Sequence, residues 1–270
     1  MPLKYPILLA HGMGFRDDRP IGYWGRIPGA LEARGERIFY SRSDGNGSIE
    51  GNARQMRASL EKLIRETGAE KVNIIAHSKG GLEARYLIST LGYGDRVASL
   101  TTLSTPHNGS VTVDRLMKRL RPAIRLGCKA TDFFMKIGGD KSPDTYGAVC
   151  AFETANAERF NRENPDIEGV YYQSYAFVMN GPGAHLFMSI PMMTVRHFEG
   201  ENDGLLAPSQ VCRGDFKGIY TGSGIRGISH CDEVDMRRAK ISIAKKNEGE
   251  CGDIIGLYIK ITEDLEAMGF

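Results

Sequence analysis

Short apolar runs are spaced regularly along the chain and alternate with amphipathic segments. They are rich in β-branched or aromatic side chains, as buried parallel strands usually are. The clearest of them cover Pro6–Ala10, Val72–Ala76, Val97–Leu103 and Val170–Val178. We expect these four segments to be strands of one sheet.

A helix is predicted between the first two runs, over residues 52–67. Met56, Leu60, Leu63 and Ile64 form an apolar stripe on an otherwise charged segment, which is the pattern of a surface helix with one buried face. Gly68 then favours its termination. Repeated alternation of strand and helix predicts an α/β fold with an open, mostly parallel sheet and helices on both faces.

The pattern changes over residues 110–150, which combine helical periodicity with a proline break at Pro122 and a Gly-rich stretch. Leucine, methionine and phenylalanine alternate here with Arg and Lys. This composition suits a helical lid inserted over an apolar cleft, although an ordinary pair of amphipathic core helices would show the same periodicity. We therefore expect one domain over 1–270, with a lid or cap insertion at 110–150.

The first candidate for chemistry is Ser78, within "NIIAHSKGGLEARY". A serine nucleophile at a sharp strand-to-helix turn needs small residues two positions before and after it. Ala76 and Gly80 meet that requirement. A serine that only caps the helix would fit the same stretch, so the distinction depends on finding an acid and a histidine later in the chain.

Six histidines compete for the role of general base: His11, His77, His107, His185, His197 and His230. The order serine, acid, histidine of this turn type leaves the last three. His197 lies in the apolar segment "MMTVRHF", which favours a core or strand-end histidine, and His185 also precedes the best acid. His230 follows a glycine-rich loop, so we predict it as the base.

The acid predicted to orient His230 is Asp203, in "FEGENDGLL". Its position before Gly204 fits a tight turn after a strand, and Leu205 and Leu206 can bury it near the sheet. A simple turn aspartate remains equally open from spacing alone. Oxyanion donors are expected at the backbone N–H of Lys79, after the serine, and of Met13, in "ILLAHGMGF".

Composition restricts the partners and the compartment. The 35 basic and 33 acidic residues give a formal net charge of +2, so no global field favours nucleic acid. Five scattered cysteines without metal-ligand spacing favour reduced thiols. No apolar run approaches a membrane span, and no signal peptide precedes the first strand. We expect a cytoplasmic protein as the sequence stands, or a secreted one if a leader had been trimmed.

Taken in order, the motifs resemble the bacterial lipase family of the α/β-hydrolase fold, related to the pseudomonad and Burkholderia triacylglycerol lipases. The resemblance rests on "YPILLAHGMGF", "TGAEKVNIIAHSKGGLEARY", "VASLTTLSTPHNGS", "ENDGLL" and "SHCDEVD". It implies Ser78 as nucleophile, Asp203 as acid and His230 as base. It also implies oxyanion donors at Met13 and Lys79 and a lid after Ser110.

The same resemblance implies a structural calcium held by two aspartates. Asp232 matches the one after the catalytic histidine, but no Asp or Glu occurs between Gly169 and Phe198, where the other is expected. A cage that lacks half its carboxylates loses much of its attraction for Ca²⁺. We therefore expect no required cofactor, with Asp232 as the one candidate calcium ligand.

The predicted function is a serine carboxylic-ester hydrolase, a lipase or esterase of lipid metabolism that acts on lipid-like acyl esters through an acyl-enzyme. A transient contact of the lid with a lipid interface would accompany it. The alternatives are an acyltransferase, thioesterase or amidase of the same fold, since fold and triad do not fix the substrate. A non-catalytic binding protein would be less consistent with a full set of nucleophile, acid and base.

Overall fold

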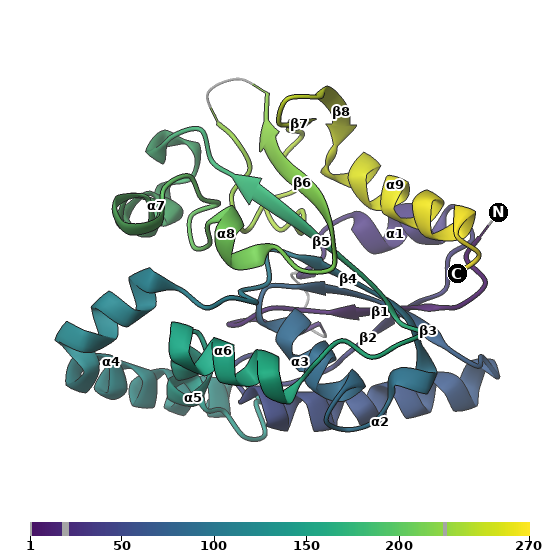
Figure 1. Cartoon of the computed structure of the whole chain (residues 1–270), viewed down its shortest axis with the longest axis horizontal. Coiled ribbons are helices and arrows are strands. Elements are labelled where there is room, and N and C mark those ends of the chain that lie inside the picture. The colour runs from purple at the N-terminus through teal and green to yellow at the C-terminus, as the bar shows by residue number, and fades with distance from the viewer. Residues whose placement is uncertain (1, 18–21, 224–225) are drawn as a thin grey trace.

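The centre of the fold is a mostly parallel sheet, seen in the computed structural model of Figure 1. The structure describes residues 2–17, 22–223 and 226–270, and within them eight strands follow the order β2-β1-β3-β4-β5-β6-β7-β8. Neighbours from β2 to β6 pair in parallel, and β7 and β8 extend the edge antiparallel. The strands are β1 (Ile7–Ala10), β2 (Ile38–Tyr40), β3 (Val72–His77), β4 (Val97–Leu103), β5 (Tyr171–Val178), β6 (Asp215–Gly222), β7 (Ser242–Lys245) and β8 (Gly249–Asp253).

The predicted fold class is confirmed, and the four apolar runs form β1, β3, β4 and β5. These strands are almost wholly buried. Strands β2, β6, β7 and β8 were not predicted from the sequence. Edge strand β8, "GECGD", is largely exposed, so its extended backbone depends on pairing with β7 rather than on a hydrophobic pattern.

Helices cover both faces of the sheet. The short α1 (Ile27–Glu32) and the C-terminal α9 (Ile254–Ala267) pack on one face, in a core that includes Trp24 and Tyr258. The helices α2 (Ile49–Thr67) and α3 (Lys79–Ile88) pack on the other face, in a second apolar cluster. Figure 1 shows these two layers on opposite sides of the strands.

Helix α2 illustrates how the sequence specifies these layers. Ser48 caps its start by accepting a hydrogen bond from the Gly51 N–H, and Gly68 ends it in a left-handed conformation with φ of 68°. Within these limits most of the predicted stripe is buried against the sheet, because Met56, Leu60 and Leu63 are at most 1% exposed, while Ile64 is partly buried. The capping residues therefore set the ends of α2, and burial of its apolar residues stabilises the helix between them.

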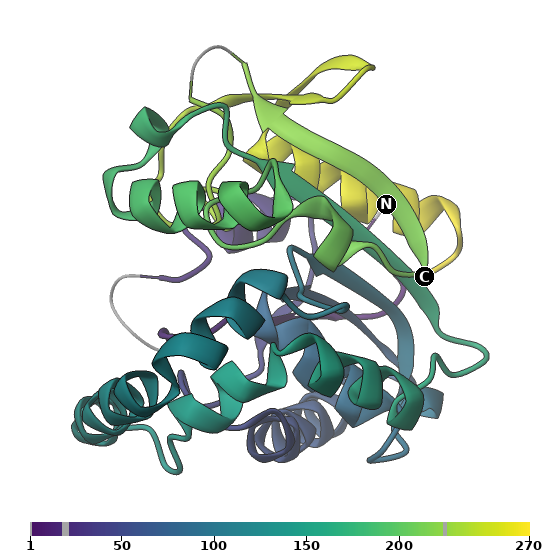
Figure 2. The same cartoon turned by 60° about the vertical axis from the view of Figure 1, so that its left-hand side comes forward.

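The region after β4 is helical, as expected for residues 110–150. It contains α4 (Val111–Ile137), α5 (Thr145–Ala151) and α6 (Thr154–Glu163), which lie outside the sheet in Figure 2. The expected proline break was wrong, because α4 continues through Pro122. Position 122 is exposed, so water can bond the carbonyl that the missing N–H leaves without a partner.

The segment between β5 and β6 differs from the expectation drawn from its sequence. It forms α7 (Leu186–Glu199) and the short α8 (Pro208–Val211). His197 is therefore neither a core nor a strand-end residue but an exposed residue of α7, and Asp203 follows a helix rather than a strand. Much of the apolar surface of α7 is exposed in the described chain. The apolar residues of this segment therefore do not follow the pattern of a surface helix with one buried apolar face.

Two single-turn 3₁₀ helices, Gly94–Arg96 and Pro182–Ala184, complete the described elements. None of the helices that the structure describes has both the length and the apolar character needed to cross a membrane.

Truncating the buried stripe of α2 should reveal its contribution to stability. We expect Leu60→Ala to lower the free energy of unfolding by about 2–5 kcal/mol, because it leaves a cavity in the core between α2 and the sheet. Leu126→Ala is the matched control, since that side chain is 71% exposed on α4 and its loss should change stability by less than about 0.5 kcal/mol. Urea unfolding would measure both, and equal effects would contradict the assigned packing.

Candidate active site

Ser78 lies at a strained turn between β3 and α3. Its backbone has φ of 54° and ψ of −132°, a conformation that an L-residue adopts only where the surroundings impose it. Gly80 makes the turn possible, because a Cβ at that position would lie 2.5 Å from the carbonyl oxygens of Ala10 and His11. The local pattern of strand, serine, small residue and helix therefore presents the Ser78 hydroxyl at the carboxyl edge of the sheet.

The predicted acid and base lie together in the structure. His230 Nδ1 is 2.7 Å from Asp203 Oδ2, and both residues are buried. The backbone N–H groups of Leu205 and Leu206 donate to the other oxygen, Oδ1, of Asp203. With both carboxylate oxygens occupied, Asp203 can fix the tautomer of His230 that leaves Nε2 available as a base.

Electrostatics keep Asp203 ionised although it is buried. Burial opposes ionisation, but attraction to His230 and the surrounding hydrogen bonds outweigh it and lower the pKa of Asp203 to about 2. A carboxylate with a depressed pKa contributes stability, here on the order of 2 kcal/mol, that is present above about pH 4. That contribution is lost as the pH falls through about 2.

Ser78 and His230 open into one cavity of about 180 Å³. The remaining lining is mostly apolar and comes from the loops after β1 and β4, from the start of α4, from the residue after α5 and from the loop that carries Asp203. Its residues are Met13, Ser78, Pro106, Ser110, Val113, Phe152, Leu205, Leu206 and His230. The predicted nucleophile and the predicted base therefore share a small, mostly apolar space.

The two predicted oxyanion donors flank the serine. Met13 lines the cavity, and Gly12 packs so tightly against Ser78 that a Cβ there would lie 2.8 Å from Ser78 Cβ. Lys79 is the first residue of α3, where a backbone N–H has no partner within its helix. The Lys79 side chain is buried, forms an ion pair with Glu83 and donates to the Gly47 carbonyl.

A buried polar network connects the loop after β1 with the acid. The Gly12 N–H donates to the Tyr23 hydroxyl oxygen over 2.9 Å, and that hydroxyl lies 2.6 Å from His77 Nδ1. His77 Nε2 is 3.1 Å from Glu233 Oε2. Glu233 in turn neighbours Asp203, whose negative charge acts on it.

Burial sets the protonation of this network. Desolvation raises the pKa of Glu233 well above its usual value, and the neighbouring Asp203 charge raises it further. Desolvation likewise lowers the pKa of His77 well below its usual value, with the nearby His230 acting in the same direction. We therefore assign a neutral acid to Glu233 and a neutral imidazole to His77.

These charge states give the hydrogen bonds a consistent direction. Because Tyr23 already accepts from Gly12, its O–H donates to His77 Nδ1. His77 is then protonated at Nε2 and donates to Glu233 Oε2, so the acidic proton of Glu233 belongs on the oxygen that faces the Asp203 and His230 side. One carboxyl of the buried pair is thus ionised and the other neutral, as two adjacent carboxyls require.

Tyr23, His77 and Glu233 were not predicted as site residues from the sequence. His77 was weighed only as a base and set aside by its position in the chain, while Glu233 lies within the quoted segment "SHCDEVD". The position of Glu233, three residues after His230, was the only feature of the local sequence that indicated a role in the site. The contacts themselves join positions separated by 54 and 156 residues, so only the tertiary structure could bring them together.

The environment of Asp232 does not fit a calcium ligand. Arg237 donates from Nε to Asp232 Oδ1 over 2.9 Å and from Nη2 to Oδ2 over 2.7 Å, and the Ser229 hydroxyl also donates to Oδ2. A guanidinium therefore already neutralises this carboxylate. Within the described ranges, Asp232 also belongs to no cluster of three side chains able to meet one ion.

One such cluster does occur in the described part of the chain. His77, His230 and Glu233 offer ligand atoms that lie within 4.8 Å of one another. His77 and His230 are already hydrogen-bonded in the network and to Asp203, and a cation there would compete with the protons assigned above. We therefore interpret this cluster as the interior of a proton-bearing network.

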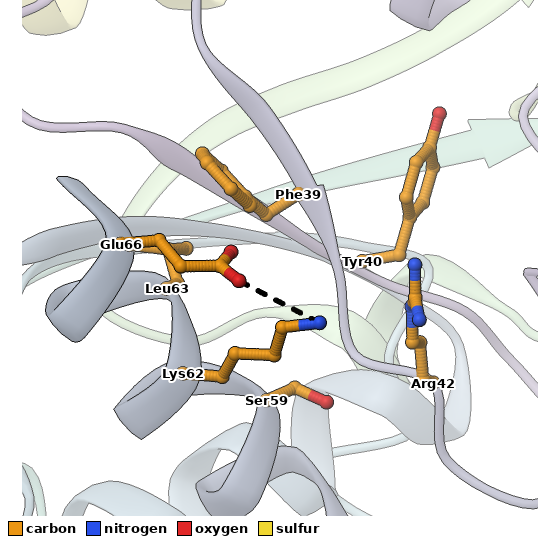
Figure 3. Close-up of a pocket in the computed structure, with 7 residues that line it drawn as sticks. All are labelled: Phe39, Tyr40, Arg42, Ser59, Lys62, Leu63 and Glu66. Carbon is orange, nitrogen blue, oxygen red and sulfur yellow. Dashed lines mark ion pairs between the residues drawn. The ribbon is translucent and has the colours of Figure 1, made fainter.

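A separate small cavity, which shares no lining residue with the Ser78 cavity, lies between β2 and α2 (Figure 3). It measures about 80 Å³ and is lined by Phe39, Tyr40, Arg42, Ser59, Lys62, Leu63 and Glu66. Lys62 and Glu66 form an ordinary ion pair one helical turn apart, 3.6 Å between Nζ and Oε1. These residues do not combine a nucleophile with a base, so the Ser78 cavity is the better candidate for chemistry.

Comparison with known proteins finds a matching thioesterase family and relatives named as lipases. The family described as palmitoyl protein thioesterase matches residues 6–177. Triacylglycerol lipase 2 of Saccharomyces cerevisiae is 27% identical over 263 residues, covering 93% of this chain and 75% of its own length. A triacylglycerol lipase of Burkholderia plantarii is 31% identical over 175 residues, covering 60% of this chain and 48% of its own.

Solved structures support the fold. The crystal structure of Staphylococcus hyicus lipase superposes with a TM-score of 0.69 at 15% identity, over 98% of this chain and 95% of its own. The structure of lipase 1 from Pelosinus fermentans superposes with a TM-score of 0.62, also at 15% identity, over 97% and 99%. The expected α/β-hydrolase fold and the resemblance to bacterial triacylglycerol lipases are confirmed.

The neutral state of Glu233 predicts a specific pH dependence of stability. Its pKa is raised from 4.5 in the folded protein, so the unfolded state releases the proton first as the pH rises, and stability falls above about pH 4.5. Glu233→Gln carries no such proton. We therefore expect the free energy of unfolding of the variant, relative to wild type, to increase by about 1 kcal/mol or more between pH 5 and pH 8.

Urea unfolding at the two pH values would test this, with Glu66→Gln as the control because Glu66 is half exposed on α2. The control should keep the pH dependence of wild type. A Glu233→Gln variant with that same dependence would show that Glu233 is ionised in the folded protein.

The Arg237–Asp232 pair predicts that removing divalent metal leaves the protein equally stable. We expect the thermal unfolding midpoint to change by less than about 1 °C when EDTA is added or when calcium is supplied in excess. Asp232→Ala should lower the midpoint, since it removes the partner of a charged side chain. A calcium-dependent rise of several degrees in wild type, absent in Asp232→Ala, would show instead that Asp232 binds the ion.

Proposed function

This chain belongs to the palmitoyl protein thioesterase family of α/β-hydrolases and is a carboxylic-ester hydrolase, and we propose that it acts on lipid-like acyl esters through Ser78, Asp203 and His230. The observation that carries the proposal is the 2.7 Å contact of His230 with Asp203, beside a cavity that Ser78 and His230 both line. The named activity of the relatives, triacylglycerol lipase, is consistent with it.

In the proposed first half-reaction, Ser78 Oγ attacks the carbonyl carbon of the bound ester. His230 Nε2 takes the hydroxyl proton, and Asp203 stabilises the imidazolium that results. The backbone N–H groups of Met13 and Lys79 hold the oxyanion, which costs little reorganisation because both are fixed by the loop and the helix. His230 then returns the proton to the departing alcohol, and the acyl group stays on Ser78.

In the second half-reaction, water takes the place of the alcohol. His230 Nε2 removes its proton as the oxygen attacks the acyl carbon, and the same N–H groups hold the second oxyanion. When this intermediate collapses, the bond to Ser78 Oγ breaks, Ser78 regains its proton from His230, and the carboxylic acid leaves. Every proton transfer uses groups of this chain, so no cofactor is required.

The apolar lining predicts which acyl groups fit. The cavity of about 180 Å³ is smaller than the roughly 300–1,000 Å³ of typical small-molecule sites, and Val113 of α4 forms part of its wall. We propose that residues 110–150 act as a lid, so that a displaced α4 admits longer chains. In the arrangement described, short acyl chains should fit best.

Thioester hydrolysis is the second candidate, because the matching family is described as a palmitoyl protein thioesterase. The chemistry would use the same acyl-enzyme, with a thiol as leaving group in place of the alcohol. Acyl transfer to an alcohol and amide hydrolysis remain variants of the same site. Comparing an ester with a thioester of the same acyl chain separates these activities.

The decisive test is hydrolysis of p-nitrophenyl esters from butyrate to palmitate, and of palmitoyl-CoA, by wild type and Ser78→Ala. We expect Ser78→Ala to lose at least about 10³-fold in kcat, since the nucleophile forms a covalent intermediate. Ser209→Ala is the control, because Ser209 is exposed on α8 and should keep wild-type activity. Hydrolysis by wild type should also be insensitive to EDTA.

Three results would oppose the proposal. Ester hydrolysis that survives in Ser78→Ala would assign the nucleophile elsewhere. Faster turnover of palmitoyl-CoA than of any ester would favour the thioesterase, and no turnover of either class would leave the fold without the proposed activity.

A further inference from the structure

Helix α4 concentrates positive charge in a nearly neutral protein. Its 27 residues include seven basic and two acidic side chains, a net charge of +5 in a chain whose total is only +2. The basic residues are Arg115, Lys118, Arg119, Arg121, Arg125, Lys129 and Lys136, and all seven are exposed. The rest of the molecule is therefore slightly acidic, and the charge of α4 is local.

The same helix exposes large apolar side chains. Leu120 is 50% exposed, and further along the helix Leu126, Phe133, Phe134 and Ile137 range from 63% to 71%. A globular protein rarely leaves so many large apolar groups on one helix in water. A basic helix with exposed aromatic and aliphatic residues is typical of a segment that lies at a membrane surface.

Helix α7 adds a second exposed apolar surface. Leu186, Phe187 and Ile190 are 79% to 84% exposed, and Met193 is 59% exposed. These residues recur at helical spacing, so they lie along one side of α7 while Met192 and Val195 are buried on the other. Helix α7 lies outside residues 110–150, where the lid was expected.

The two helices are joined beside the Ser78 cavity. Glu199, the last residue of α7, accepts hydrogen bonds from the Ser110 hydroxyl and from the Thr112 N–H at the start of α4. Ser110 and Val113 also line the cavity. Figures 1 and 2 both show α4 and α7 at the same end of the molecule. The exposed residues therefore lie on two helices that meet beside the cavity.

A hollow on the surface of α4 is lined by basic side chains that can bind an anionic group. It has a volume of about 540 Å³ and is lined by Arg121, Pro122, Arg125, Leu126, Lys129 and Tyr146. Arg121 is paired with Glu153, and Arg125 lies over the Tyr146 ring at 5.6 Å. Within the described part of the chain neither Arg125 nor Lys129 has a carboxylate partner, so two cations face the solvent beside exposed Leu126.

We propose that the exposed residues of α4 and α7 dock this protein on an anionic lipid surface, with Arg125 and Lys129 contacting lipid phosphates and the apolar residues entering the acyl region. Charge complementarity selects this occupant, since basic side chains are attracted to anionic leaflets. A second copy of the chain is disfavoured, because symmetric pairing through α4 would bring the +5 charges together. The proposal concerns binding alone and does not depend on ester hydrolysis.

The test is co-sedimentation with vesicles, using Ser78→Ala as the background so that no lipid is hydrolysed during the measurement. Vesicles of phosphatidylcholine alone are compared with vesicles that contain 30% (roughly one lipid in three) phosphatidylglycerol, at low and at high salt. We expect at least about tenfold stronger partition into the anionic vesicles at low salt, with most of the difference lost at high salt, because salt screens the attraction.

Two double variants separate the charge from the apolar contribution. Each basic residue near an anionic surface changes partition by roughly fivefold, so Arg125→Glu/Lys129→Glu should weaken binding to anionic vesicles by at least about 20-fold. Phe187→Ser/Ile190→Ser should weaken binding to both kinds of vesicle. Arg54→Glu/Arg65→Glu makes the same change in net charge at exposed positions of α2 and should weaken binding by no more than about threefold.

Thermal unfolding midpoints within about 2 °C of the background would show that each variant is folded. Three outcomes would overturn the proposal. One is equal binding to neutral and anionic vesicles, and another is equal loss in the α4 and α2 charge variants. The third is a stable dimer in size-exclusion chromatography that Phe187→Ser/Ile190→Ser dissociates, which would assign the apolar surface to a second copy of this chain.

Discussion

The buried contact between Asp203 and His230 is the constraint on which the rest of the site depends. A carboxylate can remain ionised away from water only if its oxygens are fully occupied. Here the imidazole takes one oxygen, and the Leu205 and Leu206 N–H groups take the other. The loop after α7 therefore has a fixed shape, and the position of the base follows from it.

That constraint extends to the residues on the opposite side of Ser78. Because Asp203 is ionised, the adjacent Glu233 must stay neutral, and its partner His77 must then donate from Nε2. Tyr23 completes the chain to Gly12, which packs against Ser78. Directed hydrogen bonds thus join the loop of the proposed oxyanion site to Glu233, which lies beside Asp203 and His230. The Arg237–Asp232 pair anchors the turn after His230 by an ion pair internal to the chain.

The surface around the cavity differs from the interior in how its charged and apolar groups are satisfied. Inside, each charge is paired or neutralised, whereas α4 and α7 expose both cations and large apolar groups to solvent. Neither feature stabilises the folded monomer in water. They are consistent with a protein whose substrate lies at a lipid interface. The exposed apolar groups lie on the two helices that meet beside the Ser78 cavity. The α4–α7 junction at Glu199 couples that surface to the wall of the cavity.

The sequence by itself determined the features that depend on local pattern. Buried strands, the helix over α2 and the turn at Ser78 follow from residues within a few positions of one another, and chain order then selected Asp203 and His230. Tertiary structure decided what depends on distant partners: β8 exists only by pairing, Pro122 is tolerated because it is exposed, and α7 is a helix whose apolar side faces outward. It also decided the network, since Tyr23, His77 and Glu233 meet only when the loops at the carboxyl ends of separate strands converge, and no local pattern encodes a contact across 156 residues.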